Sequence, residues 1–233
     1  MKLAFVYAGQ GSQKVGMGRD FYDQYPEYRA VLDNAGLDFD LKTLTFEGPI
    51  EELSQTRYTQ PCMAAFAVGV TDLLYARGIR PCAAAGLSLG EYSALYAAGV
   101  LDRETVLKTL AFRGRAMEQA AEGLACGMTA VLSLERDKLQ AACDQASELG
   151  VVQICNYNCP GQLVISGEKA AVDRAGELAK ELGAKRCMPL RVSGPFHTRL
   201  MKPAGDALAD YFKTITFHPM ALPVYFNCKG GPM

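Results

Sequence analysis

Ser88 stands at the centre of the pentapeptide GLSLG (86–90) and is the residue of this chain best suited to act as a nucleophile. The short apolar segment PCAAAGL (81–87) leads into it, and the helix-favouring run LGEYSALYAAGVL (89–101) follows it. A strand, a tight turn and a helix in this order expose a serine hydroxyl at the turn. The pentapeptide alone is a weak signal, because glycine and serine are common, but its surroundings predict a nucleophile.

A serine hydroxyl needs a base to take its proton, and imidazole is the usual one because its pKa lies near neutrality. The chain has two histidines. His197 lies in SGPFHT, a loop rich in glycine and proline, whereas His218 precedes a proline near the chain end. We expect His197 to be the base. For either histidine the alternative is a structural or surface role.

Attack on a carbonyl also needs hydrogen-bond donors for the oxyanion. Leu89 N–H, the first amide after the nucleophile, is one candidate, aided by the positive end of the helix dipole. Gln10 N–H, in the glycine-rich segment GQGSQKVGMG (9–18), is the second. That segment matches neither the dinucleotide motif nor a phosphate-binding loop, so nucleotide binding is disfavoured.

Composition excludes several other classes of protein. The net charge is −1, from 24 basic and 25 acidic residues, so we expect neither nucleic acid nor a membrane surface as partner. The eight cysteines contain no C-x-x-C pair and predict reduced thiols, with no metal site. No apolar run approaches the length of a membrane span, and LAFVYA (3–8) is too short for a signal-peptide core. These features favour a cytoplasmic protein.

The first part of the chain predicts alternating strands and helices. LAFVYA reads as a strand buried on both faces, because it is continuously apolar. An amphipathic helix is expected over 18–35, and a second over 59–77, with Thr59 as its cap and Pro61 in its first turn. Asp102 is expected to cap a third helix, 103–121.

From residue 124 the pattern changes to strand, helix, strand, strand, helix, strand over about 70 residues. This order predicts a small ferredoxin-like α+β domain, 124–192, inserted in a larger α/β domain formed by 1–123 and 193–233. The expected fold class is therefore α/β, with a hydrolase-like, mostly parallel sheet in the large domain.

Six strings, taken together, resemble the malonyl-CoA:acyl carrier protein transacylase family, which includes the acyltransferase domains of fatty acid and polyketide synthases. They occur in the family's order and span nearly the whole chain: GQGSQ (9–13), TQP (59–61), GLSLGEYSAL (86–95), FRGRAM (112–117), NYNCPGQLVISG (156–167) and GPFHTRLMKPA (194–204). The resemblance implies a ping-pong reaction in which Ser88, with His197 as base, takes malonyl from coenzyme A and passes it to the pantetheine thiol of acyl carrier protein.

The resemblance also implies roles for further residues. Arg113 matches the arginine that pairs with the malonyl carboxylate, and a planar guanidinium can hold a carboxylate through two parallel hydrogen bonds. Gln10 and Leu89 match the oxyanion-hole positions. Asn158 matches an asparagine near the active-site entrance, although turn chemistry alone could explain it. Phe196 resembles the bulky residue of members that select malonyl over methylmalonyl; simple core packing is the alternative.

Two features depart from the family pattern. Leu87 stands where the family usually has histidine before the nucleophile, so we expect altered activity. Members of the family also usually continue for several tens of residues past the PV..N string, so the expected large domain is C-terminally incomplete and His197 loses a group that orients it. Two alternatives therefore stay open: a serine thioesterase or esterase, and a catalytically impaired fragment that only binds coenzyme A or carrier protein.

The expected partners are malonyl-CoA and acyl carrier protein, and no tightly bound cofactor is expected beyond the coenzyme A thioester that serves as substrate. Carrier proteins are typically acidic, so a basic rim is expected on the docking face. The candidates lie close in sequence to the return loop, and the alternative for each is an ordinary solvated charge: Lys185, Arg186, Arg191, Arg199 and Lys202.

Overall fold

The computed structural model describes residues 2–233. The chain forms two compact units, Met1–Arg115 with Asp210–Met233, and Ala116–Ala209. Two helices, α7 (Arg103–Ala121) and α10 (Lys202–Phe212), contribute residues to both units. The segment 124–192 lies wholly within the second unit.

The sheet of the first unit has the strand order β1-β2-β7-β8. Its strands are β1 (Ala4–Tyr7), β2 (Ala83–Gly86), β7 (Val224–Phe226) and β8 (Gly231–Pro232). β1 and β7 both run parallel to β2, and only the short β8 is antiparallel. This mostly parallel sheet confirms the fold class expected for the first unit.

β1 differs from its prediction in one respect. It stands at one end of the strand order, and alternate residues face outward, with Val6 79% exposed. The prediction that this strand is buried on both faces is therefore wrong for the residues described. A continuous apolar run indicates that a strand is hydrophobic, but it does not indicate which faces of the strand are packed against other elements.

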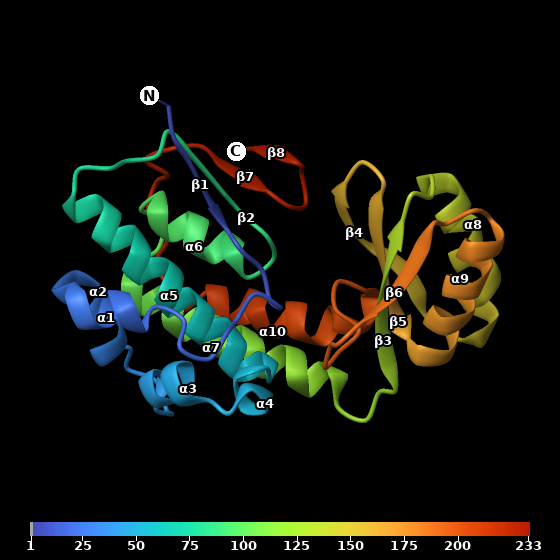
Figure 1. Ribbon diagram of the computed structural model, residues 1–233, viewed down its shortest axis with the longest axis horizontal. Coiled ribbons are helices and arrows are strands. Elements are labelled where there is room, and N and C mark those ends of the chain that lie inside the picture. The colour runs from blue at the N-terminus through green and yellow to red at the C-terminus, as the bar shows by residue number, and fades with distance from the viewer. Residues whose placement is uncertain (1) are drawn as a thin grey trace. The chain divides into compact units, whose positions relative to one another are not determined.

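Helices pack beside the first sheet and supply most of the core of this unit (Figure 1). The long α5 (Thr56–Ala76), α6 (Gly90–Ala97) and α7 bury an apolar cluster that includes Val68, Ala94 and Leu107. Four shorter helices precede them: α1 (Arg19–Gln24), α2 (Pro26–Asp33), α3 (Leu41–Glu47) and α4 (Ile50–Leu53).

Two predicted helices needed correction. The helix expected over 18–35 is two helices, because Tyr25 precedes Pro26 and adopts an extended conformation with φ −125°. The helix expected from Thr59 begins three residues earlier, at Thr56, and Thr59 donates instead to Leu53 O at 2.6 Å. The predicted cap of α7 is confirmed, since Asp102 accepts a hydrogen bond from Thr105 N–H at 2.7 Å.

The second unit has the predicted ferredoxin-like order. Its strands are β3 (Cys126–Leu132), β4 (Val152–Cys159), β5 (Gln162–Glu168) and β6 (Arg186–Leu190), in the spatial order β4-β5-β3-β6 with all pairs antiparallel. Helices α8 (Arg136–Ala146) and α9 (Lys169–Glu181) lie side by side on one face of this sheet (Figure 1) and bury Leu139, Val172 and Leu178.

No helix within residues 2–233 combines the length and the apolar character needed to cross a membrane.

Candidate active site

Ser88 occupies a sharp turn between the end of β2 at Gly86 and the start of α6 at Gly90. Its φ of 52° lies in the left-handed region, which non-glycine residues rarely adopt and which is common at functional sites. The flanking glycines make the turn possible. A Cβ at Gly86 would lie 2.0 Å from the Gly90 carbonyl carbon, and a Cβ at Gly90 would lie 2.5 Å from Tyr7 O. The structure thus gives a reason for each glycine of GLSLG.

Arg113 is the cation of the site. It is only 9% exposed, and its Nη2 donates to Ser88 Oγ at 3.1 Å while its Nη1 donates to Gln60 Oε1 at 2.8 Å. The guanidinium also lies 5.7 Å from the ring centroid of Tyr92. Burial lowers the pKa of Arg113, and Tyr92 and Glu91 oppose that effect. Among residues 2–233, no carboxylate lies within ion-pair distance of Arg113.

Close contact between two helices positions Arg113. A Cβ at Gly114 would lie 2.7 Å from Arg57 Cα and from Thr56 O, so α7 rests directly against α5, the helix that carries Gln60. Arg115 points elsewhere: it is half exposed and forms an ion pair with Asp38 at 2.9 Å. The two arginines of FRGRAM therefore have different environments, one buried and one at the surface.

The candidate oxyanion donors lie on either side of the turn. Leu89 is 2% exposed, and its amide is the first after Ser88. Gln10 is anchored by a hydrogen bond from its Nε2 to Thr56 Oγ1 at 3.0 Å. Within the part of the chain that the structure describes, neither backbone N–H has an acceptor. Both amides are thus available to a carbonyl oxygen.

Leu87 packs against the glycine-rich loop. A Cβ at Gly9 would lie 3.0 Å from Leu87 O and 3.1 to 3.2 Å from its side chain. The side chain is nonetheless 47% exposed. Leu87 offers no hydrogen bond from its side chain at this position.

The remaining predicted residues belong to the second unit. His197 is exposed and has φ 60°, and the following Thr198 fastens the loop by donating to Pro195 O at 2.7 Å. Phe196 is 6% exposed and packs in an apolar cluster with Met117 and Met201.

Asn158 is exposed near the end of the β4–β5 hairpin, where the strand register shifts between Tyr157 and Cys159. The five candidate rim residues, all exposed, are Lys185, Arg186, Arg191, Arg199 and Lys202. Lys202 forms an ion pair with Asp206 at 2.6 Å.

Sequence reasoning missed three residues of the first unit. Gln60 lies beside Arg113, and Asn227 and Glu91 bind each other beside Ser88. Gln60 is polar but only 1% exposed. The sequence feature that could have identified it is a glutamine in the largely apolar run TQPCMAAFAVG. For Asn227 the signal was the PVYFN string, to which no role was assigned.

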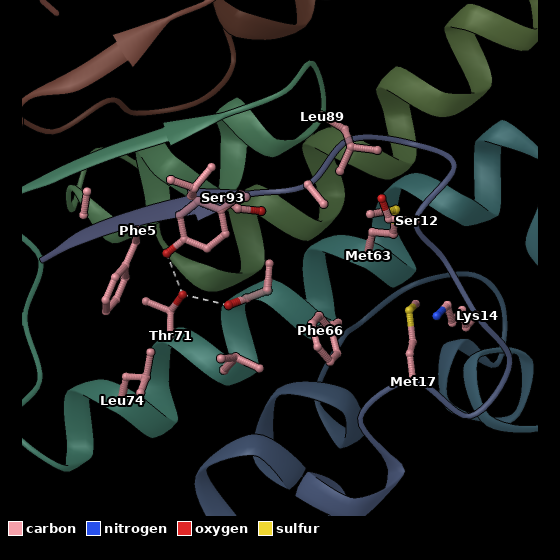
Figure 2. Close-up of a pocket in the computed structure, with 16 residues that line it drawn as sticks. Phe5, Ser12, Lys14, Met17, Met63, Phe66, Thr71, Leu74, Leu89 and Ser93 are labelled. Atoms are coloured by element: carbon pink, nitrogen blue, oxygen red, sulfur yellow. Dashed lines mark hydrogen bonds between the residues drawn. The ribbon is translucent and has the colours of Figure 1, made fainter. Parts of the chain in front are cut away.

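A cavity of about 530 Å³ lies close to these residues. It is mostly apolar and is formed between β1, the glycine-rich loop, α5 and α6. Figure 2 shows Phe66, Met63 and Leu89 around it. Tyr7 and Thr71 also line the cavity, and their hydroxyl groups share a hydrogen bond at 2.8 Å. Ser88, Gln60 and Arg113 do not line it, so the cavity is distinct from the nucleophile and its arginine.

Three cysteines are poor candidates for a nucleophile. Burial raises the pKa of Cys62, Cys143 and Cys155 to about 12, so their reactive thiolates are scarce at neutral pH. Across residues 2–233, no group of three or more His, Cys, Asp or Glu side chains is placed to hold a metal ion. Ser88, in contrast, lies 3.1 Å from the buried Arg113 guanidinium.

Known proteins share the sequence pattern and the fold of this chain. The acyl transferase domain family matches residues 4–232. The chain is 42% identical, over its whole length and 74% of the relative's, to the malonyl CoA-acyl carrier protein transacylase of Bacillus subtilis.

Two solved structures are similar. One is MCAT from Streptococcus pneumoniae, with a TM-score of 0.93 and 49% identity, over all of this chain and 76% of that one. The other is a malonyl-transacylase in complex with its type II polyketide synthase acyl-carrier protein, with a TM-score of 0.94 and 40% identity, over 97% of this chain and 74% of that one. The family match and the full-length similarity lead to one conclusion: this chain belongs to the acyl transferase family.

Proposed function

We propose that this chain transfers a malonyl group from malonyl-CoA to the pantetheine thiol of acyl carrier protein through a malonyl ester on Ser88. One observation carries the proposal: Arg113 is a buried cation, 3.1 Å from the nucleophile, with no carboxylate partner among residues 2–233. Burying a charge is costly unless it is paired. An acyl group that brings its own carboxylate supplies the missing partner.

The same feature argues for acid-bearing acyl groups over neutral ones. A malonyl carboxylate can accept two hydrogen bonds from the guanidinium, whereas an acetyl group leaves it unpaired. A general thioesterase or esterase has no use for a buried arginine beside its serine. The names of the relatives, malonyl transacylases with 40% or more identity, support the same substrate.

The proposed reaction has two symmetrical halves. In the first, Ser88 Oγ attacks the thioester carbonyl, His197 accepts the hydroxyl proton, and the C–S bond breaks. The proton then passes to the departing sulfur, which leaves as coenzyme A thiol. In the second half, the pantetheine thiol gives its proton to His197 and attacks the ester, and the proton returns to Ser88 Oγ. No redox step or cofactor is needed.

The other roles in the proposal follow the expectations from sequence. Leu89 N–H and Gln10 N–H stabilise the oxyanion, and the free state of both amides supports this assignment. Phe196 restricts the space available for an α-methyl group, and Asn158 contacts substrate. The exposed basic residues from Lys185 to Lys202 bind the acidic carrier protein.

The proposal extends to the organisation and setting of the chain. A large domain of 1–123 and 193–233 supplies the nucleophile, and a small domain of 124–192 carries Asn158. We infer a cytoplasmic location, supported by the coenzyme A thioester substrate and by eight cysteines that are all free thiols.

Incubation with radiolabelled malonyl-CoA and holo carrier protein tests the proposal. A stable label on the chain that moves to carrier protein, and that Ser88→Ala abolishes, supports the transacylase. Release of free malonate instead supports a thioesterase, and absence of any label supports a fragment that only binds.

A further inference from the structure

We propose that Asn227 is a positioning residue, which holds the backbone of Ser88 in its reactive conformation. The chemistry that Ser88 performs rests on the proposed function, but the contact does not. Asn227 follows directly after β7, which pairs in parallel with β2, so the asparagine lies at the same sheet edge as the nucleophile turn. The carboxyl ends of parallel strands are where open α/β sheets place their sites.

Asn227 binds both sides of the turn. Its Oδ1 accepts a hydrogen bond from Ser88 N–H at 2.7 Å, and its Nδ2 donates to Gly86 O at 2.7 Å. One amide side chain therefore bridges the last residue of β2 and the nucleophile. An amide is suited to this task because it offers an acceptor and a donor side by side.

A third hydrogen bond fixes the asparagine itself. Asn227 N–H donates to Glu91 Oε1 at 2.6 Å, and Glu91 lies in the first turn of α6. The loop after β7 is thereby fastened to the strand, the turn and the helix that together form the nucleophile elbow.

The strained conformation of Ser88 makes such a support useful. A non-glycine residue at φ 52° persists only where its surroundings hold it there. The hydrogen bond to Asn227 also occupies Ser88 N–H. Leu89 N–H is therefore the first amide after the turn that is free to donate to an oxyanion. Asn227 thus fixes the hydroxyl and the neighbouring oxyanion donor together, and none of its three hydrogen bonds goes to Arg113 or Gln60.

Amide hydrogen exchange tests the contact without reference to activity. In Asn227→Ala, we expect Ser88 N–H to exchange at least tenfold faster, while amides of α7 keep their rates. Asn227→Asp keeps the oxygen acceptor but not the donor, so its exchange at Ser88 should lie closer to the parent than to the alanine variant. Unchanged exchange in Asn227→Ala, or equally fast exchange in both variants, would overturn the proposal.

Measurement of acylation kinetics tests the positioning role of Asn227. Single-turnover acylation of Ser88 by malonyl-CoA can be followed by intact mass. In Asn227→Ala we expect the acylation rate at saturating malonyl-CoA to fall 10- to 100-fold. The malonyl-CoA concentration that gives half the maximal rate should stay within about twofold of the parent, because Arg113 still binds the carboxylate. Cys228→Ala, an exposed neighbour in the same loop, is the control and should behave like the parent. The positioning role would be contradicted if the rate at saturating malonyl-CoA were unchanged, or if only the half-saturating concentration of malonyl-CoA rose.

Hydrogen exchange and acylation kinetics together distinguish failure of the proposed function from failure of the positioning role of Asn227. If the parent itself does not form an acyl adduct, the proposed function fails, while the exchange measurement still decides whether Asn227 holds the turn. If the parent is acylated and exchange at Ser88 does not respond to Asn227→Ala, only the positioning role fails.

Discussion

The Arg113 guanidinium donates a hydrogen bond to the Ser88 hydroxyl oxygen at 3.1 Å. A donor on this oxygen occupies a lone pair that the nucleophile needs. Under the proposed function, a malonyl carboxylate that binds the guanidinium would compete for the same N–H groups. Recognition of the acid and release of the hydroxyl would then be coupled through one side chain.

Gln60→Glu tests whether Arg113 awaits a carboxylate. The new side chain would place an acid where Gln60 Oε1 now accepts from Arg113 at 2.8 Å. We expect it to pair with the guanidinium and compete with malonyl, so that acylation by malonyl-CoA falls at least tenfold. The urea midpoint should stay the same or rise. A variant that folds normally and acylates at the parent rate would count against a binding role for Arg113.

Gly114→Ala tests the helix contact that positions Arg113. In an isolated helix the change would stabilise by about 1 kcal/mol. Here the new Cβ would lie 2.7 Å from Arg57 Cα and Thr56 O, and overpacking of this kind costs about 1–3 kcal/mol, so we expect net destabilisation.

Gly205→Ala in α10 is the matched control for Gly114→Ala. A Cβ at Gly205 would have no neighbour within 4 Å, so the same substitution should stabilise by about 0.5–1 kcal/mol. Urea unfolding of both variants gives the comparison. The same sign of change at both positions would contradict the close approach of α7 to α5.

Glu91→Gln tests the environment of the elbow through pH. Burial raises the pKa of Glu91 above its ordinary value of 4.5, although Asn227 N–H and Arg113 oppose the shift. The folded protein therefore binds this proton more tightly than the unfolded chain, and the contribution of Glu91 to stability falls as pH rises from 4.5 through the raised pKa.

A glutamine cannot ionise, yet its Oε1 can still accept from Asn227 N–H. The stability of Glu91→Gln relative to the parent should therefore increase as pH rises through that window and then level off. Urea midpoints from about pH 4 to 8 measure it, with the exposed Glu122→Gln as a control for net charge. A difference that does not vary with pH would show that Glu91 is not desolvated.

Leu87→His restores the residue that usually precedes the nucleophile in the family. The side chain is 47% exposed, so a polar ring can be accommodated at little cost in stability. We expect acylation by malonyl-CoA to become faster and the urea midpoint to change little. An unchanged rate would mean that leucine serves the site equally well.

The order of helices and strands could be predicted from the sequence because the patterns that indicate strands, turns and helix caps in this chain are local. The GLSLG glycines, the Asp102 cap and the βαββαβ order all depend on neighbours in sequence, and the structure has each of them. The exposure of β1 depends on which other strand or helix covers it, and no local pattern records that.

The same distinction holds for the site. The family resemblance implied that Arg113 pairs with the malonyl carboxylate, but spacing did not predict its contact with Ser88, because 25 residues separate them. Asn227 lies 139 residues from Ser88, and the PVYFN string that contains it does not indicate which group its amide would bind. A residue that supports a nucleophile through the backbone is hard to assign from sequence, because its partners are peptide groups.

The most direct test of the central claim is the acylation of Ser88 by malonyl-CoA and by acetyl-CoA in the parent and in Arg113→Ala, read by intact mass, with the surface variant Arg115→Ala as control. Truncating one member of a buried charge pair costs about 2–5 kcal/mol, so malonyl acylation should fall by roughly 30-fold or more. Acetyl acylation should fall less, or rise as the hydroxyl is released. Equal losses with both thioesters would contradict the account, because Arg113 would then support the fold or the serine without recognising the carboxylate.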